Sequence, residues 1–148
     1  MDTPFYRRVY RIFYLPVRAY FRLVFRVRVE GLENIPESGA TVLCCNHLSM
    51  LDPVILIAWS PRQTSFMAKS ELFHNKLLGW LLRGLDIIPI NRGKVDVGAM
   101  KACLKWLKAG RMLGIFPEGT RNKAVSDDIK AGVGMLTYRT KEIGRAHV

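Results

Sequence analysis

Residues 41–59 read TVLCCNHLSMLDPVILIAW, and the prediction of the fold begins from them. The apolar run at 41–45 predicts a buried strand, and the apolar run at 54–59 predicts a helix. His47 lies where the strand ends, and Asp52 follows five residues later. Because ligands bind at the carboxyl ends of strands in open α/β sheets, the same stretch is the first candidate for a functional site.

The residue after Asp52 suggests how the two side chains could meet. On a continuous helix, residues five apart point about 140° away from each other. Pro53 disfavours the helical conformation at Asp52, so we expect residues 48–51 to fold back and bring the carboxylate to His47. A carboxylate fixes the tautomer of a histidine and leaves its other nitrogen free to take a proton. Each residue also has a simpler interpretation: Asp52 as a helix N-cap, and His47 as a hydrogen-bonded histidine at a strand end.

The remainder of the chain alternates strand-like and helix-like segments. This alternation predicts one α/β domain with a mostly parallel or mixed sheet flanked by helices. In one predicted helix, four leucines and Trp80 form a single apolar stripe. The further strands are expected at 26–30 (a short edge strand), 64–68, 87–90 and 112–116, the further helices at 75–83 and 95–109, and a turn region at 31–39.

Polar residues follow three of the predicted strands. They are Asn46-His47, Asn91-Arg92 and the run from Glu118 to Arg121. Parallel strands would place all three ends at one edge of the sheet. Guanidinium groups match phosphate oxygens in a bidentate manner, so the pattern indicates a base beside an anion site. Arg92 or Arg121, considered alone, could also be an ordinary solvent-exposed arginine in a loop.

The net charge of +11 is concentrated at the N-terminus, where residues 1–28 hold seven arginines and one acid. At helical spacing, the arginines at 7, 11, 18 and 22 fall within an arc of about 60° opposite apolar and aromatic residues. This pattern favours an amphipathic segment at 1–25 that lies in an anionic membrane interface, with Pro16 kinking or dividing it. A helix packed on its own domain and a nucleic-acid-binding arm are the alternatives. The longest uncharged run there is far shorter than the roughly 20 residues that span a bilayer.

The three cysteines show no spacing typical of a metal site, and we predict none. Cys44 and Cys45 are neighbours in a strand, so their side chains point to opposite faces and cannot easily pair. Buried, reduced thiols are the favoured interpretation. A nucleophilic cysteine beside His47 is the alternative.

The last seven residues, EIGRAHV, match the translation of a sequencing adapter. We therefore expect residues 142–148 to be a non-native tail and the natural chain to be truncated near Lys141. A genuine helix end is the alternative. The predicted α/β domain then covers residues 26–141.

Three blocks of the chain resemble motifs of the glycerolipid acyltransferase family, the 1-acylglycerol-3-phosphate acyltransferases. Residues 46–52, NHLSMLD, resemble the family's NHxSxxD block. Residues 88–92, IPINR, resemble its second block, and residues 116–121, FPEGTR, resemble its third. The likeness covers roughly residues 25–138. Asn122 departs from the serine common after the third block, and the family's fourth block, a proline-containing strand, is missing.

The resemblance implies a membrane-associated enzyme on the cytoplasmic face. It would move an acyl group from acyl-CoA or acyl-ACP to the hydroxyl of 1-acylglycerol 3-phosphate, giving phosphatidic acid, with no bound cofactor and no acyl-enzyme. Glycerol 3-phosphate or another lysophospholipid is the alternative acceptor, and a non-catalytic basic module binding membranes or nucleic acid is the alternative of another class. No nucleic-acid partner is expected. The residues implied are His47 as general base, Asp52 as its partner, Asn46 and Ser49 in support, Arg92, Glu118, Gly119, Thr120 and Arg121 on the acceptor, and Lys130 and Gly132 in a following Lys-x-Gly match.

Overall fold

The computed structural model describes residues 4–91, 96–116 and 145–147. Its centre is a parallel sheet with the strand order β3-β2-β4-β1-β5. The α/β fold with a parallel sheet flanked by helices is therefore confirmed. The strands are β1 (Thr41–Cys44), β2 (Thr64–Lys69), β3 (Ile88–Ile90), β4 (Met112–Ile115) and β5 (Arg145–His147), and the helices are α1 (Pro4–Val24), α2 (Asp52–Trp59), α3 (Lys76–Gly84) and α4 (Val97–Lys108).

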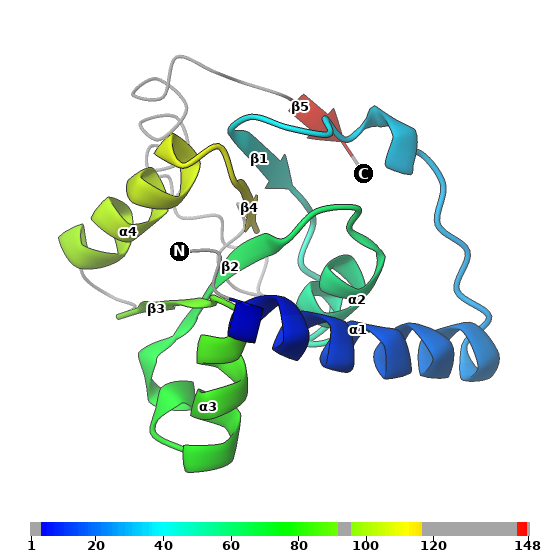
Figure 1. The fold of residues 1–148 in the computed structure, drawn as a ribbon, viewed down its shortest axis with the longest axis horizontal. Coiled ribbons are helices and arrows are strands. Elements are labelled where there is room, and N and C mark those ends of the chain that lie inside the picture. Colours follow the sequence, from blue (N-terminus) through cyan, green and yellow to red (C-terminus); the bar gives the residue numbers. More distant parts are fainter. Residues whose placement is uncertain (1–3, 92–95, 117–144, 148) are drawn as a thin grey trace.

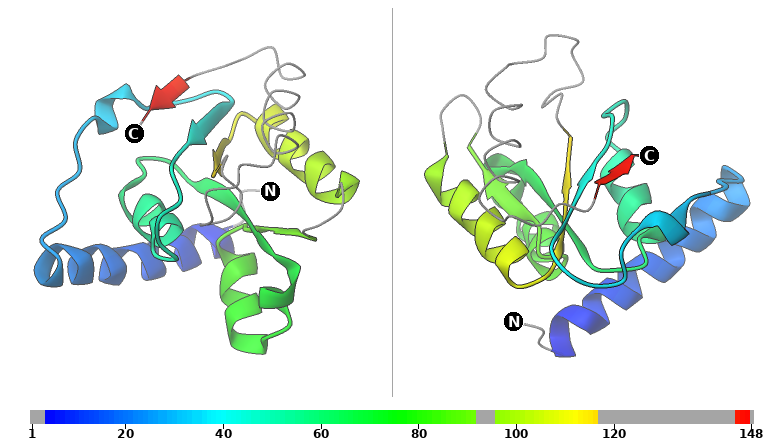
Figure 2. Two further views of the ribbon diagram at one scale, coloured as in Figure 1. Left: turned by 180° about the vertical axis from the view of Figure 1, so that it is seen from behind. Right: turned by 90° about the horizontal axis from the view of Figure 1, so that it is seen from above.

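The sheet is covered on both faces, as Figure 2 shows most clearly in the view from above, with α4 on one side and α1 and α2 on the other. Neighbouring residues of β1 therefore serve different layers. Val42 packs with Cys103 and Leu113 on the α4 side. Leu43 packs with Met112 on the opposite side.

Helix α1 is continuous through Pro16 and lies across α2 (Figure 1). Phe21 is buried against Ala58 and Trp59 of α2. A second apolar face of the helix is left exposed, with Ile12 and Leu23 accessible over 72% and 79% of their surfaces. One face of α1 thus packs on its own domain, and a membrane-interface role for the exposed face stays a prediction. No helix in the described part of the chain is long and apolar enough to cross a bilayer.

The predicted edge strand at 26–30 is wrong. Arg26 adopts a left-handed conformation with φ of 50°, which turns the chain out of α1. Val27 and Val29 then pack against the cluster around Phe21 and Trp59. The alternation of apolar residues arises because one side of this segment packs on helices, and no strand pairs with it among the described residues.

The apolar stripe of α3 is only partly used in the core. Leu81 and Leu82 pack with the cluster around Phe66. Leu77 and Trp80 are 76% and 52% exposed. The helix begins at Asn75, whose side chain accepts hydrogen bonds from the amides of Leu77 and Leu78, as expected of an N-cap.

Residues 145–147 form β5, which pairs with β1. These residues belong to the segment expected to be a non-native tail. Strand pairing joins main-chain groups and does not require particular side chains. The origin of the tail therefore stays a prediction.

Candidate active site

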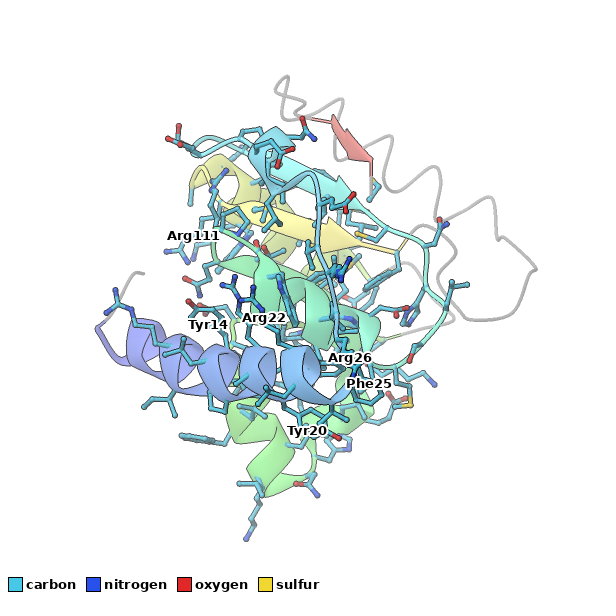
Figure 3. All side chains as sticks on the ribbon, turned by 90° about the vertical axis from the view of Figure 1, so that its right-hand side faces the viewer. Tyr14, Tyr20, Arg22, Phe25, Arg26 and Arg111 are labelled. Carbon is cyan, nitrogen blue, oxygen red and sulfur yellow. The ribbon has the colours of Figure 1, made fainter. Side chains whose placement is uncertain are left out.

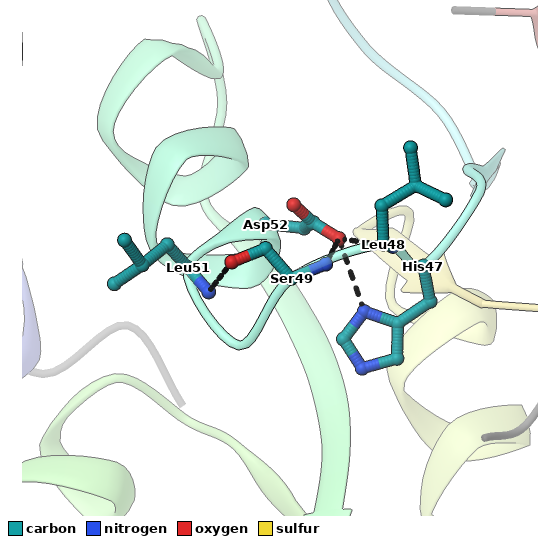
Figure 4. A network of polar contacts seen from close by, with 5 residues as sticks. All are labelled: His47, Leu48, Ser49, Leu51 and Asp52. Carbon is teal, nitrogen blue, oxygen red and sulfur yellow. Dashed lines mark hydrogen bonds and ion pairs between the residues drawn. The ribbon is translucent and has the colours of Figure 1, made fainter. Parts of the chain in front are cut away.

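The loop between β1 and α2 brings His47 and Asp52 together (Figure 4). His47 Nδ1 lies 3.2 Å from Asp52 Oδ2. The same oxygen accepts hydrogen bonds of 2.7 Å from the amides of Leu48 and Ser49. The predicted fold-back of residues 48–51 is confirmed by this geometry.

Asp52 is not the N-cap of α2, so that simpler interpretation is wrong. The N-cap is Leu51, and Asp52 lies in the first helical turn with Pro53 beside it. Its carboxylate turns back to the preceding loop because the amides of Leu48 and Ser49 point towards it. Two amide donors therefore fix the oxygen that meets His47.

The backbone of this loop is held by a second set of contacts. Ser49 Oγ accepts a hydrogen bond of 3.2 Å from the amide of Leu51. The carbonyl of Ser49 accepts one of 3.3 Å from the amide of Asp52. Ser49 thus supports the turn from both its side chain and its backbone, while Asn46 is an exposed residue lining a small cavity with Cys45 and Asp52.

Phe116 fixes the other side of the histidine, a contact that the sequence motifs do not reveal. Its ring stacks on His47 with centroids 4.3 Å apart and an interplanar angle of 27°. Phe66 stacks in turn on Phe116 at 5.5 Å. Gly114 makes room for this arrangement, because a Cβ at that position would lie 2.0 Å from the ring of Phe66.

The histidine is thus held between a carboxylate and an aromatic ring. Its side chain is 15% exposed and that of Asp52 is 21% exposed. With the proton placed on Nδ1, so that it donates to the carboxylate, Nε2 is available to accept a proton. This is the arrangement of a general base with its orienting carboxylate.

The cysteines near the site are poorly suited to act as nucleophiles. Burial, with the nearby charges of Cys44 and Asp52, raises the pKa of Cys45 to about 11. Burial also raises the pKa of the Cys44 thiol. Because the thiolate is the reactive form, the alternative of a nucleophilic cysteine beside His47 is not supported.

All five predicted acceptor-binding residues, Arg92, Glu118, Gly119, Thr120 and Arg121, lie outside the described residues, and so do Lys130 and Gly132. Their chain neighbours are placed: Asn91 directly follows β3, and Phe116 directly follows β4. The strands are parallel, so Asn91 and Phe116 lie at the same edge of the sheet as His47.

The position of Asn91 is fixed by a residue that the sequence reasoning missed. Asp96 caps α4 by accepting from the amide of Ala99, and its other oxygen accepts from the backbone amide of Asn91 at 2.9 Å. These two backbone hydrogen bonds lower the pKa of the Asp96 carboxyl. An Asx N-cap before an apolar helix was the signal that could have identified it.

Among the described residues, no cluster of histidines, cysteines and acids could hold a metal ion.

Comparisons with known proteins show the family to which the chain belongs. Residues 26–144 match the family model for Acyltransferase. The 1-acyl-sn-glycerol-3-phosphate acyltransferase of Bacillus subtilis (strain 168) is 36% identical over 121 residues, which cover 81% of this chain and 58% of that protein. The protein of the same name from Streptococcus pneumoniae is 34% identical over 76% of this chain and 42% of its own length.

A solved structure shows the same fold. The crystal structure of the 1-acyl-sn-glycerophosphate (LPA) acyltransferase, PlsC, from Thermotoga maritima aligns with a TM-score of 0.71 and 28% identity over 91% of this chain and 55% of that one. The chain thus spans about half the length of these relatives. With the family model matching most of its length, the chain belongs to the acyltransferase family.

Proposed function

We propose that the protein is an O-acyltransferase that acylates the free hydroxyl of 1-acylglycerol 3-phosphate and so makes phosphatidic acid. The observation that carries the proposal is the His47–Asp52 pair, with its carboxylate oxygen fixed by two backbone amides. The names of the two relatives and of the solved structure each include 1-acylglycerol phosphate as the acceptor, which supports this substrate class.

The reaction follows from the geometry of the pair. His47 Nε2 takes the proton of the acceptor hydroxyl as its oxygen attacks the carbonyl carbon of an acyl thioester. The Asp52 carboxylate stabilises the imidazolium that forms. The carbon–sulfur bond of the tetrahedral intermediate then breaks, and the leaving thiolate takes the proton from Nε2. Acyl-CoA or acyl-ACP would supply the thioester as co-substrate, with no bound cofactor.

The acceptor's phosphate requires cations at the same edge of the sheet. Arg92 and Arg121 follow β3 and β4 in the chain and are proposed for that role, since guanidinium groups bind phosphate in a bidentate manner. Glu118, Gly119 and Thr120 lie beside Arg121 in sequence and are proposed for the glycerol portion. Asn46 and Ser49 support the catalytic loop.

The direct test is acyl transfer by the full-length protein with a panel of acceptors. We expect 1-acylglycerol 3-phosphate to be acylated faster than glycerol 3-phosphate or an unphosphorylated monoacylglycerol. In Arg121→Ala, we expect the two phosphorylated acceptors to lose rate while the unphosphorylated one changes little. Preference for glycerol 3-phosphate would favour the alternative acceptor. Equal loss with all three acceptors would contradict the role of Arg121.

We further propose that α1 holds the enzyme on the cytoplasmic face of an anionic membrane. Its exposed apolar face, which includes Ile12 and Leu23, adjoins its arginine face on the helix circumference. Removing the helix would also remove Phe21 from the core. Substitution at the exposed positions is therefore the cleaner experiment.

The test measures how the original protein and its variants bind to mixed vesicles that contain phosphatidylglycerol and phosphatidylcholine. Ile12→Ser with Leu23→Ser should weaken binding at least tenfold, because about 1.5–3 kcal/mol of apolar burial is lost at each side chain. Val97→Ser, a similarly exposed position on α4 at the other face of the sheet, is the matched control. Equal binding of the double variant and the control would refute the interfacial helix, and tighter binding to duplex DNA would favour the nucleic-acid alternative.

A further inference from the structure

A second candidate site lies at the opposite end of α2 from the catalytic pair. It is a cavity of about 570 Å³ between α1, the segment that follows it and Trp59. Asp52 begins α2 and Trp59 ends it, so the two sites are separated by about 10 Å along the helix axis. The volume is in the range of small-molecule sites. His47 does not line this cavity.

Four arginines line the cavity because the chain reverses direction at its rim. Arg18 and Arg22 come from the last turns of α1. The helix ends as the amides of residues 25 and 27 both donate to the carbonyl of Phe21. The left-handed backbone at Arg26 then directs the chain back along the cavity, which adds Arg26 and Arg28.

Figure 3 shows Arg22 and Arg26 on the side of α1 that faces the domain, with Tyr20 on the other side. Arg22, Arg26 and Arg28 are exposed and Arg18 is half-buried, so the cavity is open to solvent on its arginine side. Within the described part of the chain, the four guanidiniums form no ion pair with a carboxylate, and Glu30 is the one acid among the lining residues. Arg18 instead lies over the ring of Trp59, 5.9 Å from its centroid.

The remaining wall of the cavity is apolar, with Val27, Val29, Leu32 and Trp59. Guanidinium groups fit phosphate oxygens in a bidentate manner, and a doubly charged phosphomonoester matches the excess of positive charge among the lining residues. The apolar wall suits a carbon chain or backbone attached to that phosphate. The two kinds of lining residue together suit an amphipathic phosphate better than a simple inorganic anion.

We propose that this cavity is a phosphomonoester-binding site distinct from the acyl-transfer site. Its ligand carries a terminal phosphate on a partly apolar body, supplied either by a lipid headgroup in the membrane or by a free phosphorylated metabolite. Binding there does not require His47, Asp52 or the proposed acyltransferase activity. One ligand is expected in this cavity, separate from any ligand at the proposed acceptor site and unlike the diffuse attraction of a basic helix to a charged surface.

The experiment measures binding of dihexanoyl phosphatidate, glycerol 3-phosphate and inorganic phosphate to the full-length protein. Calorimetry gives the stoichiometry, and the fluorescence of Trp59 reports occupancy of this cavity, with Trp59→Phe identifying its share of the signal. Arg22→Gln with Arg28→Gln should weaken binding at the Trp59 site at least about tenfold, because two charge-assisted hydrogen-bonding groups are lost.

Arg11→Gln with Arg7→Gln is the matched control. It removes the same charge, both positions being on α1, whereas Arg28 of the cavity variant follows that helix. Arg11 lies within about 20° of Arg22 around the axis but three turns away from it. Arg121→Ala separates this site from the proposed acceptor site. Its Trp59 signal should be unchanged, even if the protein transfers no acyl group.

The proposal is supported by saturable binding that the cavity variant loses and that the two controls keep. Stronger binding of dihexanoyl phosphatidate than of glycerol 3-phosphate identifies a lipid source, and equal binding identifies a free phosphate ester. Equal weakening by the Arg7 and Arg11 substitutions, or a Trp59 signal that does not saturate, would overturn the proposal.

Discussion

Asp52 accepts hydrogen bonds from two loop amides and also places a negative charge beside His47. Replacing Asp52 by asparagine separates these two roles. Asparagine has the same shape and retains one carbonyl oxygen. Two amide donors at 2.7 Å face the position of Oδ2, and His47 Nδ1 meets it at 3.2 Å. The carbonyl oxygen should occupy that position, because the opposite orientation would leave both amides facing an NH₂ group. The loop and the tautomer of His47 are then kept, and the charge is lost.

The expected size of the effect follows from distance and exposure. Unit charges about 4 Å apart interact by roughly 4 kcal/mol near a protein surface and by about 1 kcal/mol in bulk water. The pair is about four-fifths buried, so about 2–3 kcal/mol of imidazolium stabilisation is lost. We therefore expect kcat to fall roughly 30- to 150-fold. Weaker amide hydrogen bonds should lower the free energy of unfolding by about 1–2 kcal/mol.

Acyl-transfer kinetics and denaturant unfolding of the full-length protein measure the two effects. Asp52→Ala is the comparison, because it removes the acceptor of both amides and should destabilise the protein more than asparagine does. A kcat within threefold of the original for Asp52→Asn would refute the electrostatic role and leave Asp52 with a structural one. A fall in kcat that merely follows the fraction unfolded would refute it as well.

Three further predictions concern the packing around the site. Phe116→Leu should lower kcat by about 3- to 10-fold with a small change in stability, because the ring stacked on His47 is lost, and kcat equal to the original would contradict that role. Gly114→Ala should lower the free energy of unfolding by about 1–3 kcal/mol, because the new methyl group displaces the ring of Phe66, and unchanged stability would contradict this packing. Burial raises the pKa of Cys103 to about 11 from 9.0, so the folded state keeps a proton that the unfolded state releases and stability should fall between pH 9 and 11. Unfolding curves of Cys103→Ala should show a shallower fall, and parallel curves would contradict the assignment.

The sequence predicts most of the catalytic loop because its determinants are local. Apolar runs locate β1 and α2. The return of Asp52 to His47 is predicted from a non-helical Asp52 before Pro53, but Asp52 is the first residue of α2, and the amides of Leu48 and Ser49 hold its carboxylate at the loop. The two amides that fix Asp52 are main-chain groups, which nearly every residue type has, so the sequence does not reveal them. Phe116 belongs to a recognised motif, yet its stacking on His47 depends on β4 lying beside β1, which only the three-dimensional pairing establishes.

The errors have a common physical cause, since a repeating apolar pattern does not say what covers it. The alternation at 26–30 is satisfied by helices and not by a neighbouring strand. The leucine stripe of α3 is half exposed. The apolar residues of α1 divide between a face packed on α2 and a face left open. The arginine cavity depends on a chain reversal at Arg26, a non-glycine residue with positive φ, which sequence patterns do not indicate.

The role of His47 is tested most directly by single-turnover acyl transfer from acyl-CoA to 1-acylglycerol 3-phosphate in His47→Gln. Glutamine preserves a hydrogen-bonding side chain at the loop but cannot accept the hydroxyl proton. We expect a rate at least about 100-fold below that of the original protein, with unfolding and vesicle binding unchanged. Retention of more than a tenth of the original rate by the folded variant would contradict the assignment of His47 as the general base.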